Sequence, residues 1–371
     1  MDSLSRITIE GFRSIQSATV ELRALNVFVG ANGAGKSNLI IFLQMINFAL
    51  SRGFQVFVQD RGPASALLHF GPKVTPVMRG SLEFRSELGL SEYRFSLAHA
   101  AGDSLVFTHE EVQFHREGYA QTQAAVPLGP GGHRESGLAE LWSDNDATAK
   151  FAKGFLNRCR VYQFHDTSLK SWIRQTAKVE NSRYLYADGG NLPAFLLDLR
   201  QQDLEIYSEI VRTLRLVLPW FDDFILQPAG NPKNPDVLLR WRMTGRPDYV
   251  LGPGQLSDGS LRIMALVTLL LQPEDRRPRL MVIDEPELGL HPAAETIIAG
   301  LIKAVATTRQ VIISTQSATL LDHFVPEDVV VVENENGRSS FMRQSPEHLK
   351  AWLDRYTMGQ IWQKDVIGGR P

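Results

Sequence analysis

The sequence predicts an α/β fold with a central, mostly parallel β-sheet, and three patterns support this. Four short apolar or β-branched segments, at residues 25–29, 280–283, 311–314 and 329–332, have the length and composition of buried parallel strands. Segments with helical spacing separate most of them, so strands alternate with helices along the chain. A glycine-rich loop follows the first of these strands directly and precedes a helix. Together the patterns favour a sheet that carries its chemistry at the carboxyl ends of its strands.

The first half of the chain is predicted to contain strands of both kinds. Two short strands, at 7–9 and 20–22, surround a turn, and strand 25–29 leads into the glycine loop and a helix over 36–50. From 80 to 114 apolar and polar residues alternate, which predicts an antiparallel sheet region. Residues 118–137 are rich in Gly, Pro and polar residues and are expected to form a surface loop.

The second half is predicted to become more helical before the regular last third. A strand is expected at 160–164, an amphipathic helix at 201–218, and a strand at 237–241 after a Pro- and Asn-rich loop. An almost wholly apolar helix at 261–271 ends before Pro273, and Pro292 suits the first position of the next helix.

Composition excludes several classes of protein. The chain has 371 residues, is 43% hydrophobic and carries a formal net charge of −2, so no global field draws it to nucleic acid or an anionic membrane. Its one cysteine, Cys159, cannot form an internal disulfide. The first residues lack the apolar stretch of a signal peptide, and the longest apolar run is too short to span a bilayer. We therefore expect a cytoplasmic protein without a membrane partner.

The glycine loop has the pattern of a phosphate-binding loop in the strand–loop–helix context that the mechanism requires. Its glycines let backbone N–H groups converge on phosphate oxygens, and the helix N-terminus adds partial positive charge. The lysine would pair with the β- and γ-phosphates and the serine would offer its hydroxyl to Mg²⁺; a turn that merely links strand and helix needs neither. The residues are Gly30, Ala31, Asn32, Gly33, Ala34, Gly35, Lys36 and Ser37, with Asn38 as a further nucleotide contact.

A second motif supplies the acidic residues that such a loop needs. Strand 280–283 ends in Asp284 and Glu285. Asp284 can hold Mg²⁺, and Glu285 can orient and deprotonate the attacking water. The sequence thus predicts binding of ATP with Mg²⁺, with Lys36 and Glu285 as catalytic residues.

A third motif carries a family resemblance. Residues 256–260, Leu-Ser-Asp-Gly-Ser, open the apolar helix and resemble the signature of ATP-binding-cassette ATPases, although Asp258 stands where that family has a second glycine. Ser257 would equally serve as an ordinary helix N-cap. The sequences Glu-Gly-Phe-Arg-Ser at 10–14 and Glu-Pro-Glu-Leu-Gly-Leu-His-Pro at 285–292 resemble the RecF and SMC branch, above all its stand-alone RecF-like ATPases of bacteria.

This resemblance implies an ATP-binding-cassette head with an added antiparallel β region and a helical signature subdomain. The chain would form one composite ATPase domain, with an N-terminal lobe at 1–165, a helical and signature subdomain at 166–275, and a C-terminal lobe at 276–371. The family dimerises around two nucleotides, so Ser257 and Gly259 would approach the nucleotide held by a second copy. The implied homodimer forms on ATP binding.

Three further residues take their roles from the same resemblance. Gln163 corresponds to the glutamine that senses Mg²⁺ and the water, and a polar surface residue would look similar. Arg13 would approach the phosphates, although a solvated arginine is also expected there. Gln316 occupies the position of the family's switch histidine, and a glutamine can hydrogen-bond a γ-phosphate but cannot carry a positive charge. Turnover is therefore expected to be slow.

Three functions remain open at this point. The first is a DNA-associated ATPase in DNA repair, genome maintenance or anti-phage defence. The second is a regulatory switch for a separate effector protein such as a nuclease. The third is a nucleotide-binding scaffold with negligible turnover. An intrinsic nuclease domain is not expected, because only about 40 residues follow the strand at 329–332.

Overall fold

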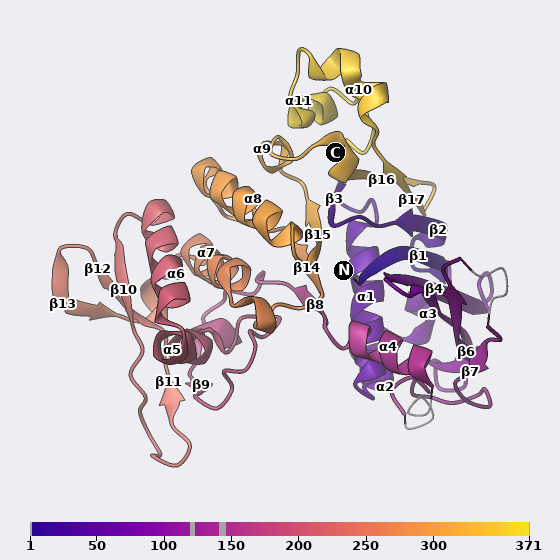
Figure 1. Cartoon of the computed structure of the whole chain (residues 1–371), viewed down its shortest axis with the longest axis horizontal. Helices are drawn as coiled ribbons and strands as arrows, with labels where there is room; N and C mark the ends of the chain where they lie inside the picture. The colour runs from indigo at the N-terminus through magenta and orange to yellow at the C-terminus, as the bar shows by residue number, and fades with distance from the viewer. Residues whose placement is uncertain (1, 119–122, 141–145, 371) are drawn as a thin grey trace.

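A central six-stranded sheet organises the chain (Figure 1). The computed structural model describes residues 2–118, 123–140 and 146–370. Five strands of the sheet are parallel, and the edge strand β17 is antiparallel to β16. In spatial order they are β17 (Arg338–Arg343), β16 (Val329–Glu335), β3 (Leu25–Val29), β15 (Gln310–Thr315), β14 (Leu280–Asp284) and β8 (Cys159–Tyr162).

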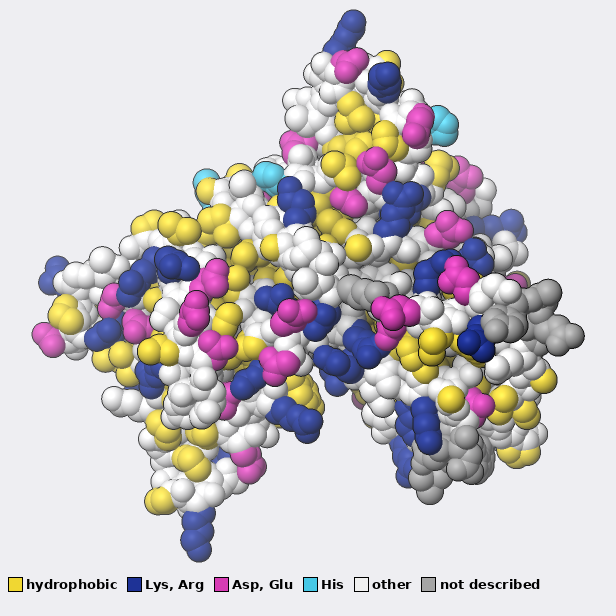
Figure 2. Space-filling model, in the orientation of Figure 1, with side chains coloured by type: hydrophobic (Ala, Val, Ile, Leu, Met, Phe, Trp, Pro, Cys, Tyr) yellow, Lys and Arg dark blue, Asp and Glu magenta, His cyan; other side chains and the backbone are white. Residues whose placement is uncertain are grey.

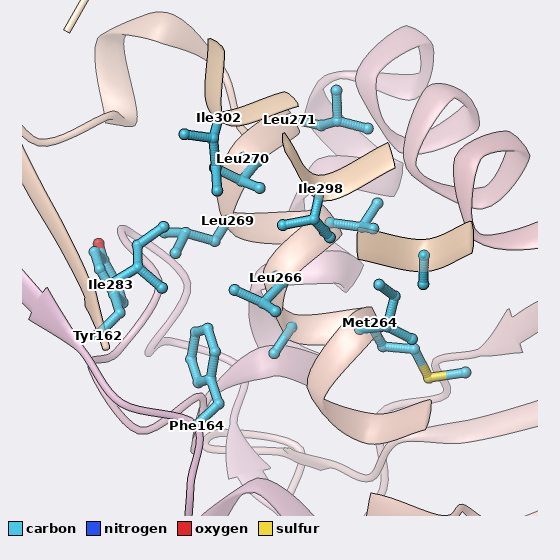
Figure 3. Packing of buried hydrophobic residues seen from close by; sticks show 14 of the residues in the cluster. Tyr162, Phe164, Met264, Leu266, Leu269, Leu270, Leu271, Ile283, Ile298 and Ile302 are labelled. Carbon is cyan, nitrogen blue, oxygen red and sulfur yellow. The ribbon is translucent and has the colours of Figure 1, made fainter. Parts of the chain in front are cut away.

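Both faces of this sheet are covered, because alternate side chains of each strand enter two different cores. On one face Met281 and Ile283 of β14 pack with α7 (Asp258–Leu271) and α8 (Pro292–Ala306). Figure 3 shows this packing, in which leucines of α7 lie between β14 and Ile298 and Ile302 of α8. On the other face Leu280 and Val282 pack with α1 (Lys36–Leu50). The near-continuous apolar strands seen in the sequence follow from this double burial.

An antiparallel sheet lies beyond α1 and shares the second core. Its spatial order is β2-β1-β4-β5-β6-β7, and β1 and β2 form the expected N-terminal hairpin. The strands are β1 (Ser3–Phe12), β2 (Ile15–Glu21), β4 (Val77–Ser86), β5 (Gly89–Ala100), β6 (Ser104–Arg116) and β7 (Val126–Pro127), and the helices beside them are α2 (Phe54–Asp60), α3 (Ala64–Leu67) and α4 (Ala147–Leu156). The predicted loop at 118–137 contains β7, and its residues 119–122 lie outside the described residues.

The segment 166–275 packs into the same core as one face of the central sheet, and it contains several short strands besides helices (Figure 1). Besides α7 it contains α5 (Leu192–Gln202) and α6 (Leu204–Val217), together with β9 (Ala177–Lys178), β10 (Phe221–Ile225), β11 (Asp236–Val237), β12 (Arg240–Met243) and β13 (Arg246–Leu251). The single strand predicted at 237–241 is wrong, because the chain turns there. Its first part, β11, pairs with β9, and the next strand, β12, pairs with β10 and β13.

The chain ends in a small helical cap next to β16 and β17. The cap consists of α9 (Ala318–Leu321), α10 (Pro346–Leu353) and α11 (Met358–Gln363). Trp362 and Ile361 of α11 are buried in the first core. Within the described residues, no helix combines the length and the apolar character that crossing a membrane requires.

The predicted α/β class, with a mostly parallel central sheet and an added antiparallel region, is confirmed. Strand β3 and helix α1 have the predicted bounds, and β14 and α7 differ from prediction by a few residues at most. The glycine loop therefore lies between β3 and α1, the acidic pair lies at the end of β14, and the signature residues lie at the start of α7.

Candidate functional site

The glycine loop lies between β3 and α1 and is held against β16 and β17. A side chain at Gly30 would overlap the carbonyl oxygen of Val332, and one at Gly35 would overlap the hydroxyl of Ser339. Gly33 and Gly35 also adopt positive φ values of 80° and 118°. Glycine is thus required both by backbone conformation and by close neighbours.

Lys36 is buried beneath this loop. Its Nζ donates hydrogen bonds to the carbonyl oxygens of Gly30, at 2.5 Å, and Ala31, at 3.0 Å. Burial lowers the pKa of Lys36, while the nearby carboxylates of Glu285 and Asp284 act in the opposite direction. The Lys36 ammonium group therefore contacts the loop and lies close enough to the two carboxylates to interact with them electrostatically.

The turn at residues 12–14 contacts the loop through Ser14 and not through Arg13. Asn38 Nδ2 donates to Ser14 Oγ at 2.6 Å, and Ser14 Oγ lies 2.6 Å from Ser339 Oγ. Ser339 in turn donates to the carbonyl oxygen of Ala34 at 2.6 Å. The Asn38 side chain, predicted to contact nucleotide, is thus engaged with Ser14.

Arg13 has a left-handed backbone, with φ of 50°. Its guanidinium donates to the Arg61 carbonyl oxygen at 3.1 Å and lies 6.0 Å from the centre of the Phe12 ring. Within the described residues these contacts do not join the Arg13 guanidinium to the glycine loop. The role predicted for Arg13 stays a prediction.

Asp284 ends β14 as a buried carboxylate with two side-chain partners. Gln163 Nε2 donates to Asp284 Oδ2 at 2.9 Å, and Ser314 Oγ donates to Asp284 Oδ1. Gln163 is held in turn by Gln44 of α1, whose Nε2 donates to Gln163 Oε1 at 2.9 Å. The structure thus brings Gln163 to Asp284. Sequence reasoning assigned no role to Ser314 or Gln44, although Ser314 lies two residues before Gln316.

Glu285 adopts a left-handed backbone, with φ of 46°, which is uncommon for a residue with a side chain. Its N–H donates to the carbonyl oxygen of Ser314 at 3.0 Å, and Gln316 Nε2 donates to its carboxylate Oε1. The turn after β14 therefore presents Glu285 to Gln316 at the end of β15. The two residues predicted to handle water and γ-phosphate lie in direct contact.

Glu287 is a further residue of the site, and sequence reasoning assigned it no role. Its Oε1 accepts hydrogen bonds from the hydroxyl of Thr315, at 2.7 Å, and from the N–H of Gln316, at 2.8 Å. Its Oε2 is buried and has no hydrogen-bond partner among the described residues. Burial raises the pKa of Glu287. Glu287 thereby fixes the backbone that carries Gln316.

The signature segment begins α7 with Ser257 as its N-cap, at an exposed position. Ser257 Oγ accepts from the N–H of Ser260 at 3.2 Å, as the alternative interpretation of this residue expects. Asp258 forms an ion pair of 2.8 Å with the buried Arg174. A side chain at Gly259 would overlap the carbonyl oxygen of Gly289, so α7 begins in close contact with the turn after the acidic pair.

Arg262, one turn further along α7, connects three parts of the site. It donates to the carbonyl oxygens of Phe164, at 3.0 Å, and His165, at 2.8 Å, just after Gln163. A longer bond of 3.4 Å reaches the carbonyl oxygen of Leu288. The signature helix, the Gln163 segment and the acidic turn are therefore joined by one guanidinium.

These residues fit a magnesium nucleotide. The exposed hydroxyl of Ser37 and the carboxylate of Asp284 offer the oxygen donors that Mg²⁺ prefers, and the Gln163 amide lies in contact with Asp284. Close packing at Gly30 and Gly35 and the positive φ values of Gly33 and Gly35 fix the loop backbone, and Lys36 lies beneath it, as a phosphate-binding loop requires.

The fold and the site together define a phosphate-loop protein of the ATPase type. Residues 25–322 match the family described as "AAA domain, putative AbiEii toxin, Type IV TA system", and the chain belongs to this family.

Two solved structures have the same fold over nearly the whole chain. One is an Smc head bound to the C-terminal winged-helix domain of ScpA, with a TM-score of 0.60, 17% identity, and coverage of 94% of this chain and 99% of that chain. The other is an Smc head with an extended coiled coil, bound to the C-terminal domain of ScpA derived from Pyrococcus furiosus, with a TM-score of 0.60, 15% identity, and coverage of 95% and 99%. The predicted likeness to SMC-type heads is confirmed at the level of fold.

A curated relative is the Old nuclease of Escherichia phage P2, 23% identical over 375 residues. The match covers 90% of this chain and 60% of that protein. This chain therefore spans about three fifths of the length of the relative.

Proposed function

We propose that this protein binds and hydrolyses ATP with Mg²⁺ as an ATP-gated homodimer that acts on DNA in repair, genome maintenance or anti-phage defence. The observation that carries the proposal is the convergence of Lys36, Asp284 and Glu285 at the carboxyl ends of β3 and β14. The two acidic residues each contact a glutamine: Gln163 contacts Asp284, and Gln316 contacts Glu285.

Each residue has a distinct part in the proposed reaction. Lys36 and the loop N–H groups hold the phosphates, while Ser37, Asp284 and Gln163 would hold Mg²⁺, which neutralises charge on the phosphates. Glu285 accepts a proton from the attacking water. The Gln316 amide donates to Glu285 Oε1, and the carboxylate keeps further lone pairs that can accept from the attacking water. Because Gln316 lacks the positive charge of a histidine, it would stabilise the γ-phosphate less, and turnover would be slow.

The dimer part of the proposal rests on two exposed positions. Ser37 of the loop and Ser257 at the start of α7 both lie at the surface of the single chain. In a two-fold dimer the two copies meet through the same surface patch. If this patch includes both Ser37 and Ser257, the loop of each copy would meet Ser257 of the other copy.

A second candidate function is a nucleotide switch that controls a nuclease. The likeness to the Old nuclease favours it. In this case ATP would still bind at the loop, and the dimer would act on an effector protein instead of DNA.

The dimer can be tested by mixing two inactive variants. Lys36→Met would weaken nucleotide binding by about 10- to 150-fold. Ser257→Arg would block the contact with the opposite nucleotide, so each variant alone should be inactive at an ATP concentration near the wild-type Kd. In an equal mixture half of the dimers are mixed, and each of these has one complete site of two, so about a quarter of wild-type turnover should return. No recovery, with both variants folded and Ser257→Arg still binding ATP, would contradict the shared site.

The DNA part can be tested separately by measuring wild-type turnover with and without DNA across a salt series. A salt-sensitive stimulation by DNA would support the first function. Unchanged turnover with DNA would favour control of an effector.

A further inference from the structure

A basic hollow lies at the end of the central sheet opposite the candidate nucleotide site. We call it the arginine hollow; its volume is about 690 Å³, and it is formed where β8 and β14 begin and by the loop before α5. Figure 2 shows dark blue side chains gathered in the notch between the lobe of α5 and α6 and the lobe of α4. The arginines that line the hollow are Arg158, Arg160, Arg183, Arg276 and Arg277.

The hollow has an excess of positive charge that the protein does not neutralise. Its carboxylates are Asp198, Glu180 and Asp275, three against five arginines. Asp198 is paired with Arg276 at 2.5 Å. None of the other four arginines forms an ion pair with a carboxylate of the described chain. Because the whole chain carries a net charge of −2, this excess is a local feature.

The guanidinium groups are partly fixed in place. Arg160 donates to the carbonyl oxygens of Asn157, at 2.7 Å, and Cys159, at 2.9 Å. Arg158 donates to the carbonyl oxygen of Arg277 at 3.2 Å. Arg183 is exposed and makes no hydrogen bond or ion pair within the part of the chain that the structure describes. Neutral carbonyl partners orient an arginine without cancelling its charge, which leaves it free to bind an anion.

Exposed aromatic rings lie beside these charges. Tyr184 is 45% exposed, and its ring lies 5.6 Å from the Arg160 guanidinium and 5.7 Å from the ring of Tyr186. A second hollow of about 410 Å³ shares Arg160 and Tyr184 with the first and is also lined by Phe48, which is 38% exposed. The two hollows thus form one continuous surface of arginines and aromatic rings.

This combination distinguishes among anionic ligands. A lone phosphate or an acidic peptide would use the arginines but has no need of an exposed aromatic ring. Single-stranded nucleic acid uses both, since its phosphates pair with guanidinium groups and its unstacked bases stack on aromatic side chains. In a duplex the base faces are hidden within the stack, so Tyr184 would have no ring to contact.

The arginine hollow is connected to the candidate nucleotide site by the strands themselves. Arg160 lies near the start of β8, and Gln163 follows the end of this strand. Arg277 precedes β14, and Asp284 ends it. At about 3.3 Å per residue, Arg160 and Gln163 are about 10 Å apart along the chain and Arg277 and Asp284 about 23 Å, so the two sites lie at opposite ends of the two strands that they share. Helix α7 likewise begins at Ser257 and ends toward Pro273, which leaves the hollow away from the proposed dimer face.

We propose that the arginine hollow binds a short stretch of single-stranded nucleic acid, with Arg158, Arg160 and Arg183 on the phosphates and Tyr184 stacked on a base. This binding site would give the proposed DNA function a location on the protein and a class of ligand. The proposal rests on the proposed function only for the biological role of the bound strand. Binding at the hollow requires no nucleotide at the glycine loop, so it can be measured independently of ATP turnover.

The test is fluorescence anisotropy of a labelled oligo(dT) of about 20 nucleotides with the full chain, without ATP, over a salt series starting at about 50 mM. The variants are Arg183→Glu and Tyr184→Ala. The matched control is Arg212→Glu on α6, which makes the same charge change at another exposed position. A labelled duplex of the same length tests whether the hollow prefers single strands. A labelled oligo(rU) of the same length tests whether it prefers DNA or RNA.

We expect Arg183→Glu to weaken binding of oligo(dT) roughly tenfold or more and to lower the salt slope by about 0.7, the value for one phosphate contact on a single strand. Tyr184→Ala should weaken binding at least about fivefold with little change of the slope. Arg212→Glu should bind as the wild type does, and the duplex should bind more weakly.

Three results would overturn the proposal: no binding by the wild type at the lowest salt, equal loss in Arg183→Glu and Arg212→Glu, or duplex binding that Tyr184→Ala leaves unchanged. Preference for oligo(rU) over oligo(dT) would support the hollow and identify RNA as its strand. Absence of ATP turnover in the wild type, with oligo(dT) binding intact, would count against the proposed ATPase and leave the hollow standing.

Discussion

Lys36→Met separates the two tasks that a buried lysine can have, phosphate binding and support of the core. The wild-type cation is held by the carbonyl oxygens of Gly30 and Ala31, and burial lowers its pKa from the usual 10.5. A lowered lysine pKa means that the folded state disfavours the charged form. At neutral pH this cost is fully present, and it fades as the pH rises through the folded pKa toward 10.5. Methionine fills similar space without the charge.

The expected magnitudes follow from these contacts. A hydrogen bond to a charged group contributes about 1.5–3 kcal/mol, so losing the lysine should weaken ATP binding by about 10- to 150-fold. The melting temperature without nucleotide should fall by no more than about 2 °C, because the removed charge was a cost to folding. The difference in free energy of unfolding between the variant and the wild type should shift in favour of the wild type as the pH is raised toward 10.5, because the cost of burying the lysine charge then disappears.

Isothermal titration with MgATP and thermal denaturation of the same preparations measure both effects. Unchanged ATP affinity would refute the assignment of the glycine loop. A large loss of stability at neutral pH would show that Lys36 serves the core.

Two further substitutions test the residues around Glu285. Gln316→His, which restores the residue usual in cassette ATPases, should raise ATP turnover or leave it unchanged; a large loss would show that the glutamine is adapted to this site. Glu287→Gln keeps an acceptor for Thr315 and Gln316 but removes a carboxylate whose pKa is raised by burial. A raised carboxyl pKa costs stability once the pH exceeds the unfolded value of about 4.5, so the variant should melt higher than wild type at pH 8 and lose this advantage near pH 4.5. Melting curves at both pH values check this, and an advantage that grows toward low pH would contradict it.

Elements with strong local signals could be predicted from the sequence. The apolar run of β3, the glycine loop and the start of α1 are adjacent in the chain, so their bounds and their order were predictable. The same holds for β14, which ends at Asp284 because the next residue adopts a left-handed backbone. The pairing of Gln163 with Asp284 was predictable only through the family resemblance.

Other parts depend on contacts between distant segments. Ser339 lies 325 residues from Ser14, and nothing around either serine in the sequence indicates that they meet beneath the glycine loop. The three-stranded sheet of β10, β12 and β13 was missed because its strands are short and interrupted by charged residues. Glu287 resembled an ordinary turn residue, and only the structure shows that its carboxylate accepts hydrogen bonds from Thr315 and Gln316.

The arginine hollow illustrates the same limit. Its arginines come from three segments, around residues 158, 183 and 276, and each segment alone has the mixed charge of a solvated surface. The excess charge becomes visible only when β8 and β14 bring these segments to one end of the sheet.

The most direct test of the proposed ATP-gated dimer is the mass of Glu285→Gln by light scattering with MgATP, with MgADP and without nucleotide. The amide removes the base and leaves Lys36, Ser37 and Asp284 to hold the nucleotide, so binding should survive while hydrolysis stops. We predict a dimer with MgATP and a monomer in the other two conditions. A monomer in all three conditions with ATP shown to be bound, or a dimer of equal affinity in all three, would contradict the account.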